Sequence, residues 1–85
     1  MVKKNLDLKE KKMYKTYVTF GQAHVHEIGG DVFDKDCVAV IDCDSAKDGR
    51  DKAFEFFDRK FCFSYFGEEF NHDTMKYFPR GFVNV

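Results

Sequence analysis

The segment Cys-Val-Ala-Val-Ile-Asp-Cys, residues 37–43, constrains the fold more than any other part of this 85-residue chain. It is apolar at both odd and even positions, whereas a strand with one face in water alternates apolar and polar residues. We therefore predict a central strand that is buried on both faces. A chain of this length supplies one small core, so we expect a single domain over residues 13–85.

Other segments of the chain also have the pattern of strands. Residues 13–20 alternate well and predict a strand with one buried face. The Gly-Gly pair at residues 29–30 separates two short extended pieces and indicates a hairpin. Residues 60–66 alternate again, and residues 76–85 are expected to form an extended edge segment with a bend at Pro79.

One amphipathic helix is predicted from about Ala46 to Arg59. Asp44 or Ser45 can cap its N-terminus, and Ser45 with Asp48 forms a weak capping box. Gly49 costs about 1 kcal/mol inside a helix, so either the first turn is distorted or the helix starts later with Asp48 as its cap. The residues expected to face the sheet are Ala46, Arg50, Ala53, Phe54, Phe56 and Phe57. The elements together predict an α+β fold: a small antiparallel or mixed sheet of four to six strands with one helix packed across one face.

The charge of the chain is unevenly distributed, although the net charge is −1. Residues 1–15 hold six lysines and two acids, whereas residues 16–85 hold eight basic and thirteen acidic residues. We interpret residues 1–12 as a basic N-terminal extension or tag. The acidic body argues against direct binding of nucleic acid. The chain has neither an apolar run of the roughly 18 to 20 residues that span a membrane nor a signal peptide, so we expect a cytoplasmic protein without a membrane partner.

The three cysteines are interpreted as buried thiols in a reducing compartment. Cys37 and Cys43 lie six residues apart on one predicted strand, a separation of about 20 Å that is far too long for a disulfide. Cys62 is also in an apolar strand context. A reactive thiol needs a polar and partly exposed environment, so we expect inert packing and predict no catalytic residue. No cofactor is predicted.

His24 and His26 stand two residues apart, and such residues on a strand point to the same side. Three interpretations are open: ordinary strand histidines, the wall of a polar pocket, or two ligands of a zinc ion. Zinc would need further ligands, such as His72. The chain has no Cys-x-x-Cys or His-x-x-x-His spacing, so we predict no metal site.

Two arginines are candidates for binding an anion. Arg50 falls in the first turn of the predicted helix, where free N–H groups and the helix dipole favour phosphate or carboxylate. The alternative is an ion pair of Arg50 with Asp42 or Asp44. Arg80 lies within the apolar segment Phe-Pro-Arg-Gly-Phe. Aromatic rings stack on bases and arginine binds phosphate, so we predict a pocket for a nucleotide-like ligand. Its predicted residues are Gln22, His24, His26, Arg50 and Arg80.

Several motifs spread over most of residues 14–81 resemble those of a family of short uncharacterised proteins from bacteriophages and prophages. The segments are YVTFGQAHVH, FDKDCVAVI, DGRDKAFEFF, KFCFSYF and YFPRG. The family has no established activity, so the resemblance transfers no catalytic residue. It implies an accessory protein of the host-cell cytoplasm that counteracts a host defence system.

The leading expectation is a non-catalytic protein that counteracts host defence by sequestering a nucleotide-like anionic ligand. One alternative is an inhibitor that blocks a host defence protein complex by protein contact, which predicts a flat acidic or aromatic surface without a deep pocket. A second alternative is a small metal-dependent enzyme. Exposed strand edges would also allow a homodimer.

Overall fold

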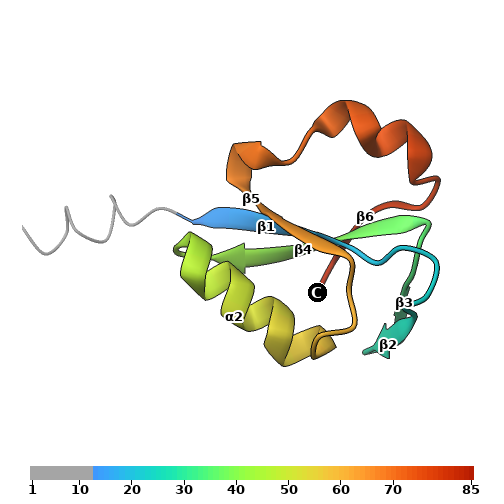
Figure 1. The fold of residues 1–85 in the computed structure, drawn as a ribbon, viewed down its shortest axis with the longest axis horizontal. Coiled ribbons are helices and arrows are strands. Elements are labelled where there is room, and N and C mark those ends of the chain that lie inside the picture. The colour runs from blue at the N-terminus through green and yellow to red at the C-terminus, as the bar shows by residue number, and fades with distance from the viewer. Residues whose placement is uncertain (1–12) are drawn as a thin grey trace, which may run out of the picture.

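The computed structural model describes residues 13–85, which fold around a four-stranded sheet (Figure 1). The strand order is β5 (Phe63–Phe66), β1 (Tyr14–Thr19), β4 (Cys37–Cys43) and β6 (Gly81–Asn84). β1 pairs antiparallel with β4 and β5, whereas β4 pairs parallel with β6. The sheet is therefore mixed, and the predicted α+β fold is confirmed. The predicted extension over residues 1–12 lies outside the described residues.

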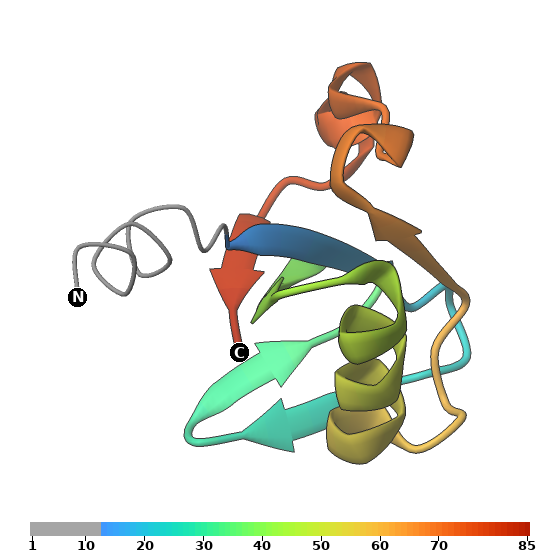
Figure 2. The same ribbon diagram turned by 90° about the vertical axis from the view of Figure 1, so that its left-hand side faces the viewer.

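One face of the sheet is covered by helix α2 (Ala46–Phe57) and by a hairpin of β2 (His26–Ile28) and β3 (Asp31–Phe33) (Figure 2). The hairpin confirms the turn predicted at residues 29–30. The main core lies between these elements and the sheet. It consists of Val18, Phe20, Phe33, Cys37, Ala39, Ile41, Ala53 and Phe57.

The opposite face is covered by the segment that joins β5 to β6 (Figure 1). This segment contains two 3-10 helices, η1 (Gly67–Glu69) and η2 (His72–Tyr77). Phe70, between them, is buried and stacks on Tyr17 of β1 with ring centroids 4.7 Å apart.

Every residue of β4 except Asp42 is buried, which confirms the prediction of a central strand.

The N-terminus of α2 is capped as the sequence predicts. Ser45 Oγ accepts a hydrogen bond from the backbone N–H of Asp48 at 3.0 Å. The Asp48 carboxylate accepts the N–H of Asp44 at 3.1 Å, one residue before the cap, so the reciprocal bond of a standard capping box is shifted by one position. That bond, with the nearby Lys52 ammonium, holds the pKa of Asp48 below its ordinary value.

The face that α2 turns toward the sheet differs from the predicted one. Its buried residues are Gly49, Ala53 and Phe57, spaced four apart. The prediction was correct for Ala53 and Phe57. It was wrong for the other four residues expected to point inward, which are exposed: Ala46, Arg50, Phe54 and Phe56. The reason is Gly49: a Cβ at this position would lie 1.9 Å from Thr16 Oγ1 and 3.0 Å from Cys43 Sγ. The helix approaches β1 most closely where it has no side chain.

The C-terminal edge segment is shorter than predicted, because residues 76 and 77, expected to be extended, belong to a 3-10 helix. Residues 72–77 form η2, whose start is capped by the Asn71 side chain accepting the N–H of Asp73 at 2.9 Å. The expected bend at Pro79 is confirmed, because the Gly81 N–H donates to the Phe78 carbonyl across a turn. Only residues 81–84 form the edge strand. Among residues 13–85 the structure has no helix that is long and apolar enough to cross a membrane.

Candidate functional site

The five residues predicted to bind a ligand lie in separate surroundings. Gln22 is exposed in the turn after β1, and His24 precedes β2 instead of lying on it. Arg50 lines one surface hollow, and none of the other four residues lines that hollow. Within the same part of the chain, no hydrogen bond or ion pair joins two of the five residues.

His26 has a structural environment. Its Nε2–H donates to the backbone carbonyl of Lys60 at 2.7 Å. Its ring contacts Phe20 and meets Phe57 edge-on, with the latter centroids 5.0 Å apart. These contacts tie the β2–β3 hairpin to the segment that follows α2. Residues 13–85 contain no group of three or more His, Cys, Asp or Glu side chains placed to hold a metal ion.

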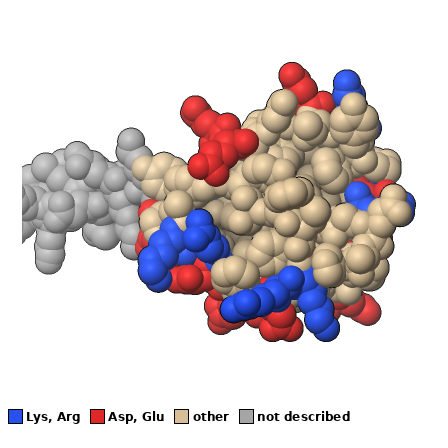
Figure 3. All heavy atoms as spheres, viewed as in Figure 1, with Lys and Arg blue, Asp and Glu red and all other residues tan. Residues whose placement is uncertain are grey.

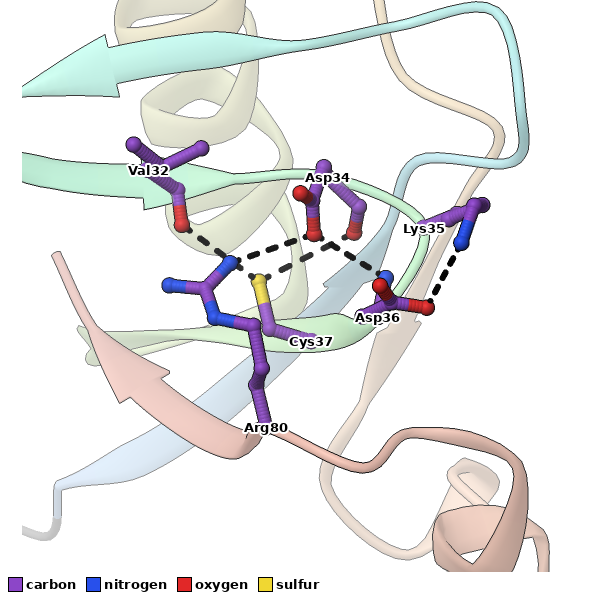
Figure 4. Close-up of polar contacts among 6 residues, drawn as sticks. All are labelled: Val32, Asp34, Lys35, Asp36, Cys37 and Arg80. Carbon is purple, nitrogen blue, oxygen red and sulfur yellow. Dashed lines mark hydrogen bonds and ion pairs between the residues drawn. The ribbon is translucent and has the colours of Figure 1, made fainter.

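Arg80 is held in an ion pair at the turn between β3 and β4 (Figure 4). Its guanidinium lies 3.1 Å from Asp34 Oδ1, which also accepts the N–H of Asp36. The backbone N–H of Arg80 donates to the Asp36 carbonyl at 2.9 Å. Arg80 therefore fastens the start of β6 to this turn, and Asp34 compensates its charge.

The buried thiol of Cys37 lies beside the same turn (Figure 4). Burial raises the pKa of Cys37, which keeps its sulfur protonated and inert. Cys43 is also buried, as predicted, and its sulfur lies 3.2 Å from Thr16 Oγ1. Cys62 is exposed, which corrects the expectation that all three thiols are buried.

Arg50 lies at the edge of the contact between α2 and the sheet. It is exposed and forms no ion pair with any described residue. The alternative pairing with Asp42 is not formed, because Asp42 pairs with Lys15 at 2.6 Å. Arg50 lines a hollow of about 80 Å³, and Glu69 lines the same hollow. The carboxylate of Glu69 opposes the binding of an anion there.

A larger hollow lies on the face of the sheet opposite α2, and sequence reasoning did not identify it. We call it the aromatic hollow; its volume is about 230 Å³. Four of its lining residues are aromatic, one is acidic, and among the described residues none that line it is Lys or Arg. The lining residues are Thr19, Tyr65, Glu69, Phe70, Asn71, Thr74, Tyr77 and Phe78.

Pairing in the sheet and the two 3-10 helices hold these residues in place. Tyr65 of β5 stands opposite Tyr17 of β1, and Phe70 packs on both rings, 4.7 Å from Tyr17 and 5.7 Å from Tyr65. Glu69 Oε1 accepts the Phe66 N–H at 3.1 Å, which fixes the carboxylate relative to β5. Tyr77, at the end of η2, is 67% exposed.

The surface around this region carries few charges. β5 lies toward the viewer in Figure 1, and the same view in Figure 3 shows a broad area without Lys, Arg, Asp or Glu, whose side chains gather at its margins. Phe63 of β5 is 58% exposed and lies 6.0 Å from Tyr65, centroid to centroid. The aromatic hollow thus adjoins exposed apolar side chains.

The signal for this site in the sequence is weak. The alternation of residues 60–66 places Tyr65 and Phe63 on one face, but residues 67–75 have no strand or helix periodicity. The rings of that segment could not be assigned to a face before its 3-10 helices were known.

No family model, no curated protein and no solved structure matches the chain. The site is therefore interpreted from its own geometry.

Proposed function

We propose that this chain is a non-catalytic bacteriophage accessory protein that counteracts a host defence system in the bacterial cytoplasm by binding one of its protein components. The resemblance of its motifs to short phage and prophage proteins supports the biological setting. The observation that carries the mode of action is the aromatic hollow beside an uncharged surface with exposed rings.

Aromatic side chains at such a surface favour a protein partner. The central parts of protein interfaces are enriched in Tyr and Phe and depleted of charge, with polar groups around them. Tyr77 and Phe63 expose more than half of their surface, so a partner that covered them would remove apolar area from water. A contiguous exposed apolar patch in a small protein typically marks an interaction site.

Sequestration of a nucleotide is the competing mode, and the charges around the hollows support it less. A nucleotide phosphate needs a cation, but the aromatic hollow is lined by Glu69 and by no described Lys or Arg. Arg80 is already paired with Asp34. Lys52 lines a further hollow of about 230 Å³, but it is paired with Asp48 and shares that hollow with Asp42. The hollow beside Arg50 has room for only a few water molecules and also contains Glu69.

Plaque assays test the proposal. The chain would be expressed in host strains that each carry one defence system, and plaquing efficiency would be compared with that of strains carrying an empty vector. We expect expression to restore plaquing by orders of magnitude against at least one system. Unchanged plaquing on every protected strain would contradict the proposed function.

Thermal unfolding with a panel of cyclic and ADP-ribose-type nucleotides separates the two modes. A ligand present at about 100 times its Kd stabilises the folded state by about 2.7 kcal/mol, which a melting curve resolves easily. Protein contact predicts no stabilisation by any nucleotide. A stabilisation that disappears in the Arg50→Ala/Arg80→Ala double variant would establish sequestration instead.

A further inference from the structure

We infer that the aromatic hollow binds the guanidinium group of an arginine presented by the partner protein. The inference deepens the proposed function and rests on it only for the statement that a protein supplies the arginine. It follows from three properties of the hollow: its rings, its carboxylate and its size.

The rings provide a surface that attracts cations. The face of an aromatic ring carries negative potential, and Arg binds such faces by both cation–π attraction and planar stacking. Tyr65, Phe70, Tyr77 and Phe78 all line the hollow. The Tyr77 ring already has a cation of its own chain nearby, because Lys76 Nζ lies 5.3 Å from its centroid.

The carboxylate of Glu69 supplies the charge that a guanidinium needs. Glu69 forms no ion pair with another described residue. One of its oxygens accepts the Phe66 N–H, and the second oxygen has no hydrogen bond from a described residue, although Glu69 also lines the hollow beside Arg50. Asp73 adjoins the lining residues in sequence, and Lys76 carries the opposite charge beside Tyr77. A guanidinium could meet the free oxygen of Glu69 while its plane rests on a ring.

The volume of the hollow suits one side chain. Pockets that hold drug-sized ligands have volumes of about 300–1,000 Å³. The aromatic hollow, at about 230 Å³, falls below that range. A single arginine side chain fits this scale better than a nucleotide, whose phosphates would also face Glu69.

Titration of the ¹⁵N-labelled chain, followed by amide chemical shifts, tests the inference. The probes are N-acetyl-arginine methylamide, its citrulline analogue, its lysine analogue and AMP. We expect the arginine probe to shift the amides of Asn71, Thr74 and Tyr77 in a saturable way. Citrulline has nearly the same shape without the charge, so it should bind at least about fivefold more weakly, as expected for loss of roughly 1 kcal/mol of cation attraction.

Two neighbouring glutamates give a matched pair of variants. Glu69→Gln removes the charge but keeps an oxygen that can accept the Phe66 N–H, so the local fold should persist. We expect this variant to weaken arginine binding at least about fivefold, the change that corresponds to roughly 1 kcal/mol. Glu68→Gln changes a residue that does not line the hollow, so it should change the affinity for arginine less than twofold. Tyr77→Leu provides a second loss-of-binding variant, at an exposed position.

Several outcomes would overturn the inference. Equal affinity for arginine and citrulline would show that charge is not recognised, and equal affinity for lysine would remove the assignment to guanidinium. If AMP shifted the same amides and the arginine probe did not, the hollow would bind an anion instead of a cation. Restored plaquing without arginine binding refutes this inference alone, whereas arginine binding without restored plaquing refutes the proposed function alone.

Discussion

The two faces of the central sheet are filled by different kinds of structure. On the α2 face a regular helix places Gly49, Ala53 and Phe57 against β1 and β4, and the Phe57 ring meets Phe20 edge-on at 4.9 Å. On the opposite face two short 3-10 helices supply separate rings, and Phe70 stacks on Tyr17 beside a hollow of about 230 Å³. The first face is closely packed around Gly49 and Phe57 and has a hollow of about 230 Å³ only at its edge, between α2 and the end of β6, whereas the hollow of the second face lies among aromatic rings.

The difference follows from helix geometry. The 12-residue helix α2 turns a residue toward the sheet every four positions, at Gly49, Ala53 and Phe57, and so presents one continuous face to it. A 3-10 helix of three to six residues has no such continuous face. Separate aromatic side chains therefore fill the space between it and the sheet, and they leave gaps. We therefore expect the α2 face to supply more of the stability and the aromatic hollow to be available for binding.

Truncation of one buried ring on each face gives the largest expected effect. Phe57→Ala should lower the free energy of unfolding by about 3–5 kcal/mol, the usual cost for a ring in a closed core. Phe70→Ala should cost less, roughly 2 kcal/mol, because the space it leaves joins the aromatic hollow and can fill with water. Urea unfolding measures both values, and equal costs would remove the distinction between the faces.

Substitution of Gly49 tests how closely α2 is packed. Alanine is favoured over glycine in a helix by about 1 kcal/mol, yet Gly49→Ala should destabilise the fold by about 3 kcal/mol because its Cβ would collide with Thr16. Adding Thr16→Ala removes the colliding hydroxyl and should recover part of the loss, a coupling that a double-mutant cycle in urea detects. A neutral or stabilising Gly49→Ala would show that α2 lies farther from β1.

The smallest expected effect is a pH-dependent contribution to the free energy of unfolding, which comes from Asp48 at the start of α2. The N–H of Asp44 and then Lys52 lower the pKa of Asp48, so the ionised carboxylate stabilises the folded state above its ordinary pKa of 3.8. This contribution is lost as pH falls through the lower pKa of the folded state. Urea midpoints for wild type and Asp48→Asn should therefore differ at neutral pH and converge between about pH 5 and pH 2.

Asp51→Asn is the matched control for that series. It removes an exposed pair with Lys47 but no hydrogen bond to the backbone. If the difference in urea midpoint between Asp51→Asn and wild type changed with pH as strongly as that for Asp48→Asn, the pH dependence would come from the overall charge of the helix and not from the Asp48 hydrogen bond.

Much of the α2 face could be predicted from the sequence, because its elements have regular periods. The apolar run of residues 37–43 identified the central strand, and Ser45, one of the caps that the sequence offered, is the residue that starts the helix. The orientation of the helix was wrong, because hydrophobicity ranked Phe54 and Phe56 above Gly49. Close packing around a missing side chain has no hydrophobic signal in the sequence.

The face of the aromatic hollow could not be predicted to the same degree. Residues 67–78 have no single period, so the sequence did not show that Phe70, Tyr77 and Phe78 would meet Tyr65. The predicted pocket relied on residue types that bind anions, but the structure pairs Arg80 with Asp34 and His26 with a backbone carbonyl. These partners come from distant segments, and local patterns do not reveal them.

The most direct test of the account compares two exposed rings on opposite faces. Tyr77 lines the aromatic hollow, whereas Phe54 is 41% exposed on α2. Tyr77→Ala and Phe54→Ala would each be assayed for urea unfolding and for plaquing on a defence-bearing host that the wild-type chain renders sensitive. We predict that both variants stay folded, with unfolding free energies within about 1 kcal/mol of wild type, and that only Tyr77→Ala loses plaquing. Full plaquing by a folded Tyr77→Ala, or its loss in Phe54→Ala alone, would contradict the claim that the aromatic hollow binds the partner.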